Sequence, residues 1–247
     1  MALQEELKSQ GDFLFKNRSY LPLIILGVGL GVYINTAYHE TEDAIETWFS
    51  ECYEYLCLGV SLLGFCVRVI TVGYSPKNTS GRNTKEGQIA DVLNTTGMYS
   101  LVRHPLYVGN FFMWLGIALL TENLWFVAAF ILLYICYYER IMYAEESFLR
   151  SKFGEQYLDW AKGVPAFVPS FKNYKKYNHS FSIKKVLKKE KNGFAAIFLL
   201  FWCFEFSGEV AQSGKFIVEY DFWFYAALTS MIIYFVLKIM KKRKWFD

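Results

Sequence analysis

The sequence predicts an all-helical protein that crosses a membrane several times, and three observations lead to that prediction. Hydrophobic residues make up 54% of the 247 residues and aromatic residues 19%. The mean hydropathy of +0.18 is high for a water-soluble domain of this length. Apolar windows of about 20 residues, the length that spans a bilayer as a helix, recur along the chain, and Lys and Arg gather in alternate connecting segments.

Six windows are apolar and long enough to be candidate spans. In chain order they are Tyr20–Tyr38, Tyr55–Tyr74, Pro105–Leu120, Leu124–Tyr143, Gly193–Gln212 and Phe222–Met240. The third window is the shortest, and only three residues, 121–123, separate it from the fourth. We therefore expect the third and fourth spans to form a tight helical hairpin.

The charges of the connecting segments predict how the spans are oriented. Residues 39–54 carry acidic groups but no Lys or Arg, whereas the next loop, the segment 144–192 and the C-terminal KKRKW are basic. Because Lys and Arg favour cytoplasmic loops, both termini are expected in the cytoplasm, which requires an even number of spans. The net charge of +3 then indicates contact with anionic lipid and not with nucleic acid. We expect a multi-pass protein of a bacterial inner membrane.

Three regions are expected along the chain. Residues 1–87 hold the N-terminal spans and a cytoplasmic loop, residues 88–170 a central unit, and residues 171–247 a basic linker, Lys172–Asn192, followed by two more spans. The five cysteines include no CxxC pair and have no histidine at metal-ligand spacing, so no metal site is expected.

The stretch YSLVRHPLYVGN, residues 99–110, places polar groups directly before an apolar span. Pro105 suits the first turn of a helix because its φ is fixed near the helical value and its missing N–H has no partner to lose there. The free N–H groups of that turn, with the guanidinium of Arg103, favour an anion such as a carboxylate or phosphate. The alternative is that Arg103 reaches toward lipid phosphates and His104 is a simple interfacial cap.

Glu145 and Glu146 leave the fourth span where Arg103 and His104 enter the third. If the hairpin places the two spans side by side, a carboxylate pair faces the anion-binding helix start across one cavity. S-adenosylmethionine would suit such a cavity, because it carries an α-carboxylate, an α-ammonium and a sulfonium. The alternative is a solvated helix face on which Arg150, four residues after Glu146, is its partner.

The pattern TTGMYSLVRHPLYVGN, followed by a hairpin and then AEESFLRSKFGEQYLDW and VPAFVP, resembles the isoprenylcysteine carboxyl methyltransferase and phospholipid methyltransferase superfamily of integral-membrane enzymes. The resemblance covers about Gln88 to Pro169. It implies a helical membrane fold with a cytosolic pocket for S-adenosylmethionine. The cofactor-binding residues that it implies are Tyr99, Arg103, His104, Pro105, Tyr107, Gly109, Glu145 and Glu146.

The expected reaction is direct methyl transfer to a lipid presented from the bilayer, with Arg103 and Glu146 as the catalytic residues. Glu146 would be the base if the acceptor were an amine. Lys77, Arg82 and Lys85 precede the motif and favour an anionic substrate, such as a phospholipid or a lipid A phosphate, although an ordinary solvated loop has the same composition. A prenylcysteine carboxyl acceptor, an NADPH-dependent sterol or enone reductase, and a non-catalytic membrane protein are the alternatives.

Overall fold

The computed structural model describes residues 2–18, 20–39, 44–76, 83–84, 87–88, 90–243 and 245, and most of these are helical. The long helices are α1 (Leu3–Lys16), α2 (Leu21–His39), α3 (Ala44–Tyr74), α5 (Pro105–Leu119), α6 (Leu124–Phe153), α8 (Ile183–Ser213) and α9 (Phe222–Lys242). The short elements are α4 (Met98–Leu101), α7 (Glu155–Gly163), the 3₁₀ turn η1 (Phe171–Asn173) and an antiparallel pair of two-residue strands, β1 (Asn83–Thr84) and β2 (Gly87–Gln88).

The helices confirm the predicted polytopic membrane fold. Five of them are long and apolar enough to cross a membrane, namely α2, α3, α6, α8 and α9. The third predicted span is α5, whose 15 residues rise about 22 Å at 1.5 Å per residue, less than the ~30 Å hydrocarbon core of a bilayer. This helix is therefore shorter than the hydrocarbon core that a full span must cross.

One sequence-based boundary was wrong. The segment 172–192 was expected to be a basic linker, but α8 already begins at Ile183. Ser182 caps this helix, because its side chain accepts a hydrogen bond from the backbone N–H of Lys185 at 3.4 Å. The lysines between positions 184 and 191 consequently lie on a helix that continues into the apolar span. The sequence prediction left them out of this helix because it was based on hydropathy, and lysines lower the hydropathy of a segment.

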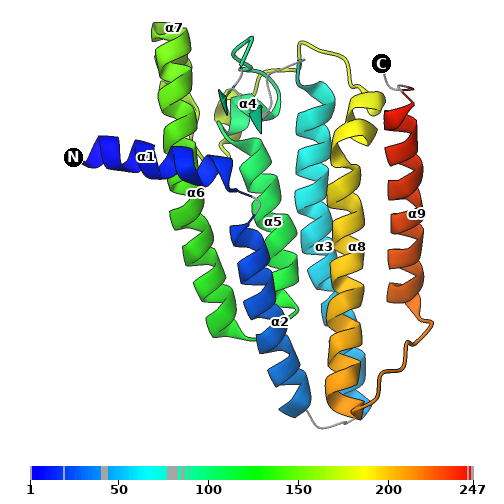
Figure 1. Cartoon of the computed structure of the whole chain (residues 1–247). Helices are drawn as coiled ribbons and strands as arrows, with labels where there is room; N and C mark the ends of the chain where they lie inside the picture. Colours follow the sequence, from blue (N-terminus) through cyan, green and yellow to red (C-terminus); the bar gives the residue numbers. More distant parts are fainter. Residues whose placement is uncertain are drawn as a thin grey trace.

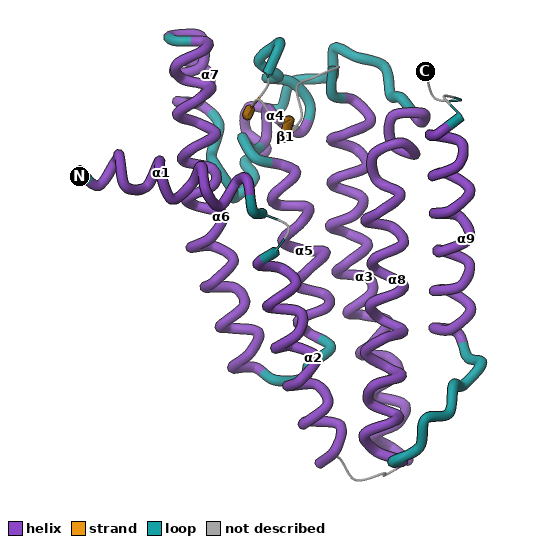
Figure 2. The backbone as a smooth tube through the Cα atoms, in the orientation of Figure 1, coloured by secondary structure: helices purple, strands orange, loops and turns teal. Residues whose placement is uncertain are grey.

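The six span helices run up and down beside one another, whereas α1 lies across α6 (Figure 1). The starts of α5 and α8, the short helices α4 and α7, and the end of α9 all lie at the end of the bundle that is uppermost in Figures 1 and 2. Most of the loop residues gather at that same end (Figure 2). Segments that are far apart in the sequence are therefore available to build one site there.

Helices α3 and α5 pack closely because small residues face each other. A Cβ added to Gly64 would lie 2.4 Å from the carbonyl oxygen of Gly109, and one added to Gly116 would lie 2.2 Å from Oγ of Ser61. The hydroxyl of Ser61 donates to the carbonyl oxygen of Met113 at 2.9 Å. Close packing of small residues and interhelical hydrogen bonds are typical of helix pairs in membranes, and here they hold α5 in a defined position.

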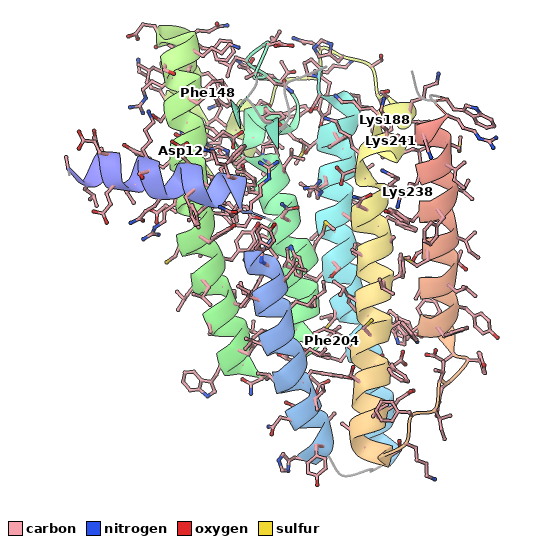
Figure 3. The ribbon with its side chains drawn as sticks, in the orientation of Figure 1. Asp12, Phe148, Lys188, Phe204, Lys238 and Lys241 are labelled. Carbon is pink, nitrogen blue, oxygen red and sulfur yellow. The ribbon has the colours of Figure 1, made fainter. Side chains whose placement is uncertain are left out.

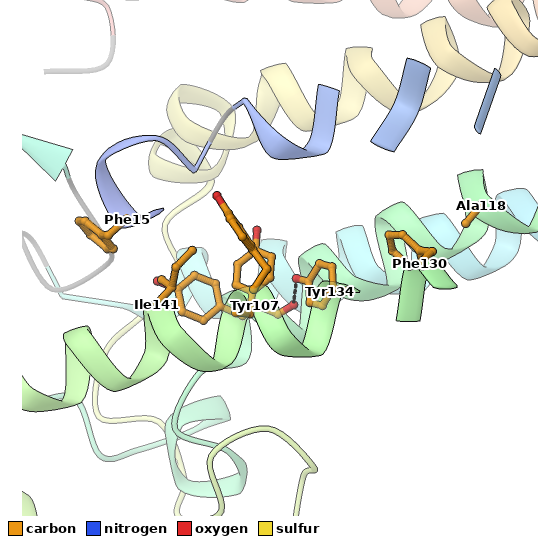
Figure 4. Close-up of a cluster of buried hydrophobic side chains, with 8 residues drawn as sticks. Phe15, Tyr107, Ala118, Phe130, Tyr134 and Ile141 are labelled. Carbon is orange, nitrogen blue, oxygen red and sulfur yellow. Dashed lines mark hydrogen bonds between the residues drawn. The ribbon is translucent and has the colours of Figure 1, made fainter. Parts of the chain in front are cut away.

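Two clusters of buried side chains surround this pair. One joins α1, α5 and α6 through Phe15, Tyr107, Tyr134 and Ile141, among others (Figure 4). The hydroxyl of Tyr134 donates to the carbonyl oxygen of Tyr107 at 2.7 Å. The other cluster joins α3, α5, α8 and α9. Both clusters include residues of α5, so that helix is held from two sides.

Replacing Gly109 by alanine tests how tightly α5 must pack. The new Cβ would lie 2.6 Å from Cγ of Arg68 and 2.8 Å from the carbonyl oxygen of Gly64. Overpacking of this kind costs about 1 to 3 kcal/mol, and a gain of up to ~1 kcal/mol in helix propensity offsets part of it. We expect a lower thermal midpoint in detergent. The control is Gly59→Ala on α3, where the added Cβ meets nothing within 4 Å; equal midpoints for the two variants would contradict the packing role.

Candidate active site

The predicted meeting of the RHP motif and the carboxylate pair is present in the structure. Nε of Arg103 donates to Oε1 of Glu146 at 2.8 Å, and Nε2 of His104 lies 3.0 Å from the same oxygen. This arrangement differs from both alternatives, namely a contact of Arg103 with lipid phosphates and a pairing of Glu146 with Arg150. Arg103 turns toward protein groups and not toward lipid, and the partners of Glu146 come from the start of α5 and not from Arg150.

Glu145 and Tyr107 complete the group of charges. The hydroxyl of Tyr107 donates to Oε2 of Glu145 at 2.9 Å, and Nδ1 of His104 lies 3.5 Å from that oxygen. The rings of His104 and Tyr107 are stacked with centroids 5.5 Å apart. His104 is therefore a buried imidazole, 5% exposed, with one carboxylate facing each of its ring nitrogens.

These carboxylates determine the charge of His104. Burial by itself would lower the pKa of the imidazole, but hydrogen bonds and charge attraction from Glu145 and Glu146 outweigh it, and the pKa is raised above the ordinary 6.5. With His104 protonated, the site has two positive groups, Arg103 and His104, opposite two negative ones. Such a site suits a ligand that carries charges of both signs.

The raised pKa of His104 predicts how stability depends on pH. The unfolded histidine loses its proton near pH 6.5 and the folded one at a higher pH, so its stabilising contribution is complete below about pH 6.5 and is lost as pH rises through the folded pKa. The thermal midpoint of the purified protein should fall as the pH rises above 6.5. The variant His104→Gln should show a flatter profile, and an unchanged slope in that variant would rule out this origin.

A segment after α7 fixes the backbone of the RHP motif. The N–H of Arg103 donates to the carbonyl oxygen of Pro165 at 2.8 Å, and the N–H of His104 donates to that of Ala166 at 3.2 Å. The guanidinium of Arg103 also donates to the carbonyl oxygens of Ala161 and Val164, at 3.0 and 2.9 Å. The VPAFVP segment thus has a structural role, because its carbonyl oxygens accept the backbone hydrogen bonds of the RHP motif, and the sequence did not reveal this role.

The other predicted site residues have different surroundings. Pro105 occupies the first turn of α5, as expected. Tyr99 lies on α4 and lines the cavity described below. The pKa of its hydroxyl is raised, chiefly by burial and to a smaller extent by the negative charge of Glu145. Gly109 faces Arg68 and Gly64 on α3. Its part in cofactor binding stays a prediction, since its observed surroundings are those of a helix contact.

A cavity of about 1610 Å³ opens beside these groups. The predicted site residues on its wall are Tyr99, Arg103, His104, Pro105, Tyr107 and Glu145. Glu146 is not on the wall and lies behind Arg103 and His104 as their shared acceptor. The remaining wall changes from charged to apolar, with Met113, Trp114, Ile117, Ile197 and Leu200 on the apolar part. The cavity therefore has the volume and the change of polarity that suit an amphiphile with a polar head and an apolar tail.

Lys77, Arg82 and Lys85, the predicted headgroup-binding residues, lie outside the described residues. Their role stays a prediction, and no part of the site above depends on them.

The sequence left the roles of several site residues unrecognised. Arg68 on α3 pairs with Glu190 on α8 through two hydrogen bonds of 2.8 Å and donates to Oδ1 of Asn110 at 2.6 Å, and all three residues line the cavity. Tyr157 on α7 is 1% exposed. The pKa of its hydroxyl is raised, chiefly by burial and to a smaller extent by the negative charge of Glu146. The one signal in the sequence for these roles was Arg68, a lone arginine inside an apolar span, because an intramembrane charge normally has a partner.

The fold and the site together define a multi-pass membrane protein with a paired-charge pocket that opens into an amphiphile-sized cavity. Residues 56–156 match the family model described as phospholipid methyltransferase, and this range includes the RHP motif and both glutamates. No solved structure matches the chain.

Three relatives show the range of similar proteins. The nickel-cobalt-cadmium resistance protein NccN of Alcaligenes xylosoxydans xylosoxydans is 32% identical over 160 residues, 64% of this chain and 67% of the relative. The cobalt-zinc-cadmium resistance protein CzcN of Cupriavidus metallidurans is 36% identical over 131 residues, 52% and 55% of the two chains. The protein-S-isoprenylcysteine O-methyltransferase of Tribolium castaneum is 31% identical over 156 residues, 58% and 56%.

The chain belongs to the superfamily of integral-membrane methyltransferases that includes the phospholipid and isoprenylcysteine enzymes. It spans about two thirds of the length of NccN and just over half of the other two relatives. Two relatives are named for metal resistance; within the described residues, no group of three or more His, Cys, Asp and Glu side chains is arranged to hold a metal ion.

Proposed function

We propose that the protein transfers a methyl group from S-adenosylmethionine to an oxygen atom of a membrane-embedded amphiphile. The observation that carries this proposal is the position of the paired charges, Arg103 and His104 with Glu145 and Glu146, at the polar end of a cavity that continues between apolar walls. The superfamily supports the same reaction class.

The residues of the pocket fit the methyl donor in charge and in donor type. The guanidinium of Arg103, on the cavity wall, would hold the α-carboxylate by its charge and through Nη2, because its Nε and Nη1 already donate to Glu146, Ala161 and Val164. Glu145 would hold the α-ammonium. The aromatic faces of Tyr99 and Tyr107 would lie against cationic or apolar parts of the ligand.

The methyl donor supplies a group that is already activated by its sulfonium, so the task of the chain is positioning. The backbone hydrogen bonds that Arg103 and His104 donate to the carbonyl oxygens of Pro165 and Ala166 fix where these two residues lie, and the apolar walls exclude water from the path of the acceptor. A carboxylate or phosphate oxygen needs no base. For an amine acceptor, the carboxylate on the wall is Glu145, so we propose Glu145, ahead of the predicted Glu146, to accept the proton.

The acceptor that the relatives favour is a prenylcysteine carboxylate. Several relatives are named protein-S-isoprenylcysteine O-methyltransferase, and an apolar wall of Trp114, Ile117 and Leu200 suits an isoprenoid chain. This support exceeds that for the anionic phospholipid or lipid A phosphate predicted from Lys77, Arg82 and Lys85. We place the pocket and both termini on the cytoplasmic side, as the charge pattern predicts.

The test measures donor binding and methyl transfer with purified protein. Glu145→Gln should weaken binding of S-adenosylmethionine about tenfold to a hundredfold, since a hydrogen bond to a charged group is worth about 1.5 to 3 kcal/mol. Glu139→Gln, the same change at an exposed position on the same helix, is the matched control and should bind as wild type. Radiolabelled transfer to a farnesylated cysteine analogue is compared with transfer to phosphatidic acid vesicles.

Two results would contradict the proposal. Binding of NADPH without binding of S-adenosylmethionine would favour a reductase, and binding of neither would favour a non-catalytic protein. Transfer to phosphatidic acid alone would return the phosphorylated lipid to first place among the acceptors. In that case the triple variant Lys77→Ala, Arg82→Ala, Lys85→Ala should lose transfer while it keeps donor affinity.

A further inference from the structure

The N-terminal helix α1 is held against the part of α6 that carries the paired charges. Figure 3 shows α1, on which Asp12 is labelled, crossing α6. A Cβ added to Gly11 would lie 2.2 Å from the carbonyl oxygen of Arg140 and 2.8 Å from Cβ of Ala144, so the two helices are in close contact there. Ala144 directly precedes Glu145 in the sequence. The end of α1 therefore lies beside the candidate active site.

Arg18 follows α1 and lines the cavity. Its guanidinium lies over the ring of Phe15, 4.4 Å from the ring centroid, and Phe15 is buried in the cluster that joins α1, α5 and α6. A cation over an aromatic face is attracted by the negative side of the ring quadrupole. The positive charge of Arg18 acts on Glu145 and on Tyr107, which belong to the paired-charge pocket. Phe15 thus helps to place a guanidinium beside that pocket.

Arg18 also lies close in sequence to the start of a membrane span. The first candidate span begins at Pro22, and both Pro22 and Leu23 line the cavity. Leu23 is 58% exposed, so the cavity wall reaches the outer surface of the bundle here, and the outer surface of a span faces lipid. A membrane-bound amphiphile keeps its charge near the interface and its apolar chain in the hydrocarbon. The carboxylate of an amphiphile that enters at this point would meet Arg18.

Among the described residues, two more arginines line the cavity, and both have other tasks. Arg68 donates to both oxygens of Glu190 at 2.8 Å, and Arg103 is the proposed partner of the α-carboxylate of the methyl donor. A second carboxylate, that of the acceptor, needs a cation of its own, because two anions at one cation repel each other. A guanidinium has five N–H donors, so Arg18 can bind this carboxylate in addition to the protein groups that it contacts.

We propose that Arg18 binds the carboxylate of the methyl acceptor and so selects amphiphiles that carry a carboxylate. The inference rests on the proposed function and deepens it by naming the residue that recognises the acceptor. Arg18 lies outside the residues that match the family model, 56–156, so membership of the superfamily does not assign this role to it.

The charge balance of the reaction gives this contact a direction. In the transfer, a lone pair of a carboxylate oxygen forms the new C–O bond as the S–CH₃ bond of the sulfonium breaks. The anionic carboxylate becomes a neutral ester, the sulfonium becomes a neutral thioether, and no proton is released. The guanidinium of Arg18 attracts the anion more strongly than the ester, so the same contact favours binding of the substrate over binding of the product.

The first experiment measures binding and does not require methyl transfer. The purified full chain in detergent is titrated with N-acetyl-S-farnesylcysteine and with the carboxamide of this compound, which has the same apolar chain and no charge. We expect wild type to bind the carboxylate about tenfold to a hundredfold more tightly, the usual effect of a hydrogen bond to a charged group. Arg18→Gln should lose most of this preference, with binding of the carboxamide nearly unchanged.

The second experiment measures radiolabelled methyl transfer to the same carboxylate. Arg18→Gln should raise the KM for the acceptor about tenfold or more with little change in kcat, because Arg18 binds the charge that the ester loses and holds the ground state at least as strongly as the transition state. Affinity for S-adenosylmethionine should not fall, since removal of a cation near Glu145 cannot weaken its attraction for the α-ammonium. A structural defect would weaken binding of the donor and of the carboxamide as well.

The matched control is Lys16→Gln, which removes the same charge from an exposed position in the last turn of α1 that does not line the cavity. It should keep the wild-type preference and KM. Arg18→Lys keeps the charge without the planar fork and should recover part of the preference. Circular dichroism checks the fold of each variant. If Arg18→Gln does not fold, Arg18→Met, whose apolar chain can pack on Phe15, takes its place.

Three outcomes would overturn the proposal: equal affinity of wild type for the carboxylate and the carboxamide, equal losses of carboxylate binding in Arg18→Gln and Lys16→Gln, or an unchanged KM for the acceptor in Arg18→Gln. Absence of methyl transfer in wild type would instead contradict the proposed function, and the binding experiment would still decide whether Arg18 recognises a carboxylate. The two failures are therefore distinguishable.

Discussion

Replacing Arg103 by glutamine is expected to lower the free energy of unfolding by about 2 to 4 kcal/mol and to abolish binding of the methyl donor. The guanidinium donates to Glu146 and to the carbonyl oxygens of Ala161 and Val164. Its loss leaves one carboxylate and two carbonyl groups without this donor, at about 1 to 3 kcal/mol for each group that stays buried. The side chains of Arg103 and Glu146 are 19% and 18% exposed, so water compensates for part of that loss.

Thermal and denaturant unfolding in detergent measure the first effect, and equilibrium dialysis with the labelled donor measures the second. Arg103→Lys keeps the charge without the planar fork and should recover only part of the stability. Arg150→Gln, one helical turn beyond Glu146 at an exposed position, is the control. If Arg150→Gln destabilised the protein and Arg103→Gln did not, Glu146 would belong to a solvated helix face after all.

Replacing Glu190 by alanine is expected to lower the free energy of unfolding by about 3 to 5 kcal/mol. Both oxygens of this carboxylate accept hydrogen bonds of 2.8 Å from Arg68, and the side chain of Glu190 is 3% exposed. Removing one partner of a buried ion pair leaves the other charge uncompensated in a medium that solvates it poorly. The pair also joins α3 to α8, so its loss should reduce the order of the cavity wall.

A double-mutant cycle separates the ion pair from the rest of the packing. Replacing both partners together, Arg68→Met with Glu190→Leu, should be close to neutral because no unpaired charge remains. The measured quantity is the thermal midpoint of the four proteins in the cycle. Strictly additive losses would mean that Arg68 and Glu190 act independently, contrary to the geometry. Glu139→Ala, at an exposed position on α6, controls for the removal of an acidic side chain.

Local properties of the sequence were enough to predict the apolar span helices and to place the RHP motif near the glutamates. The windows Tyr20–Tyr38 and Phe222–Met240 agree closely with α2 (Leu21–His39) and α9 (Phe222–Lys242), because burial in lipid depends on the hydropathy of each segment by itself. The hairpin loop of three residues forces its two helices to be neighbours. This is why the approach of Arg103 and His104 to the glutamates was predictable from spacing.

The tertiary structure alone decided which side each polar group faces and which distant group it meets. Arg68 and Glu190 are 122 positions apart, and no periodicity in either segment relates them. Glu145 reaches the cavity wall and Glu146 does not, although the two are adjacent, because successive residues on a helix point about 100° apart. Backbone hydrogen bonds from Arg103 and His104 to Pro165 and Ala166 likewise form only when the chain has turned back after α7. Hydropathy is a property of one segment, whereas a contact requires the positions of two, and only packing of the whole bundle supplies those positions.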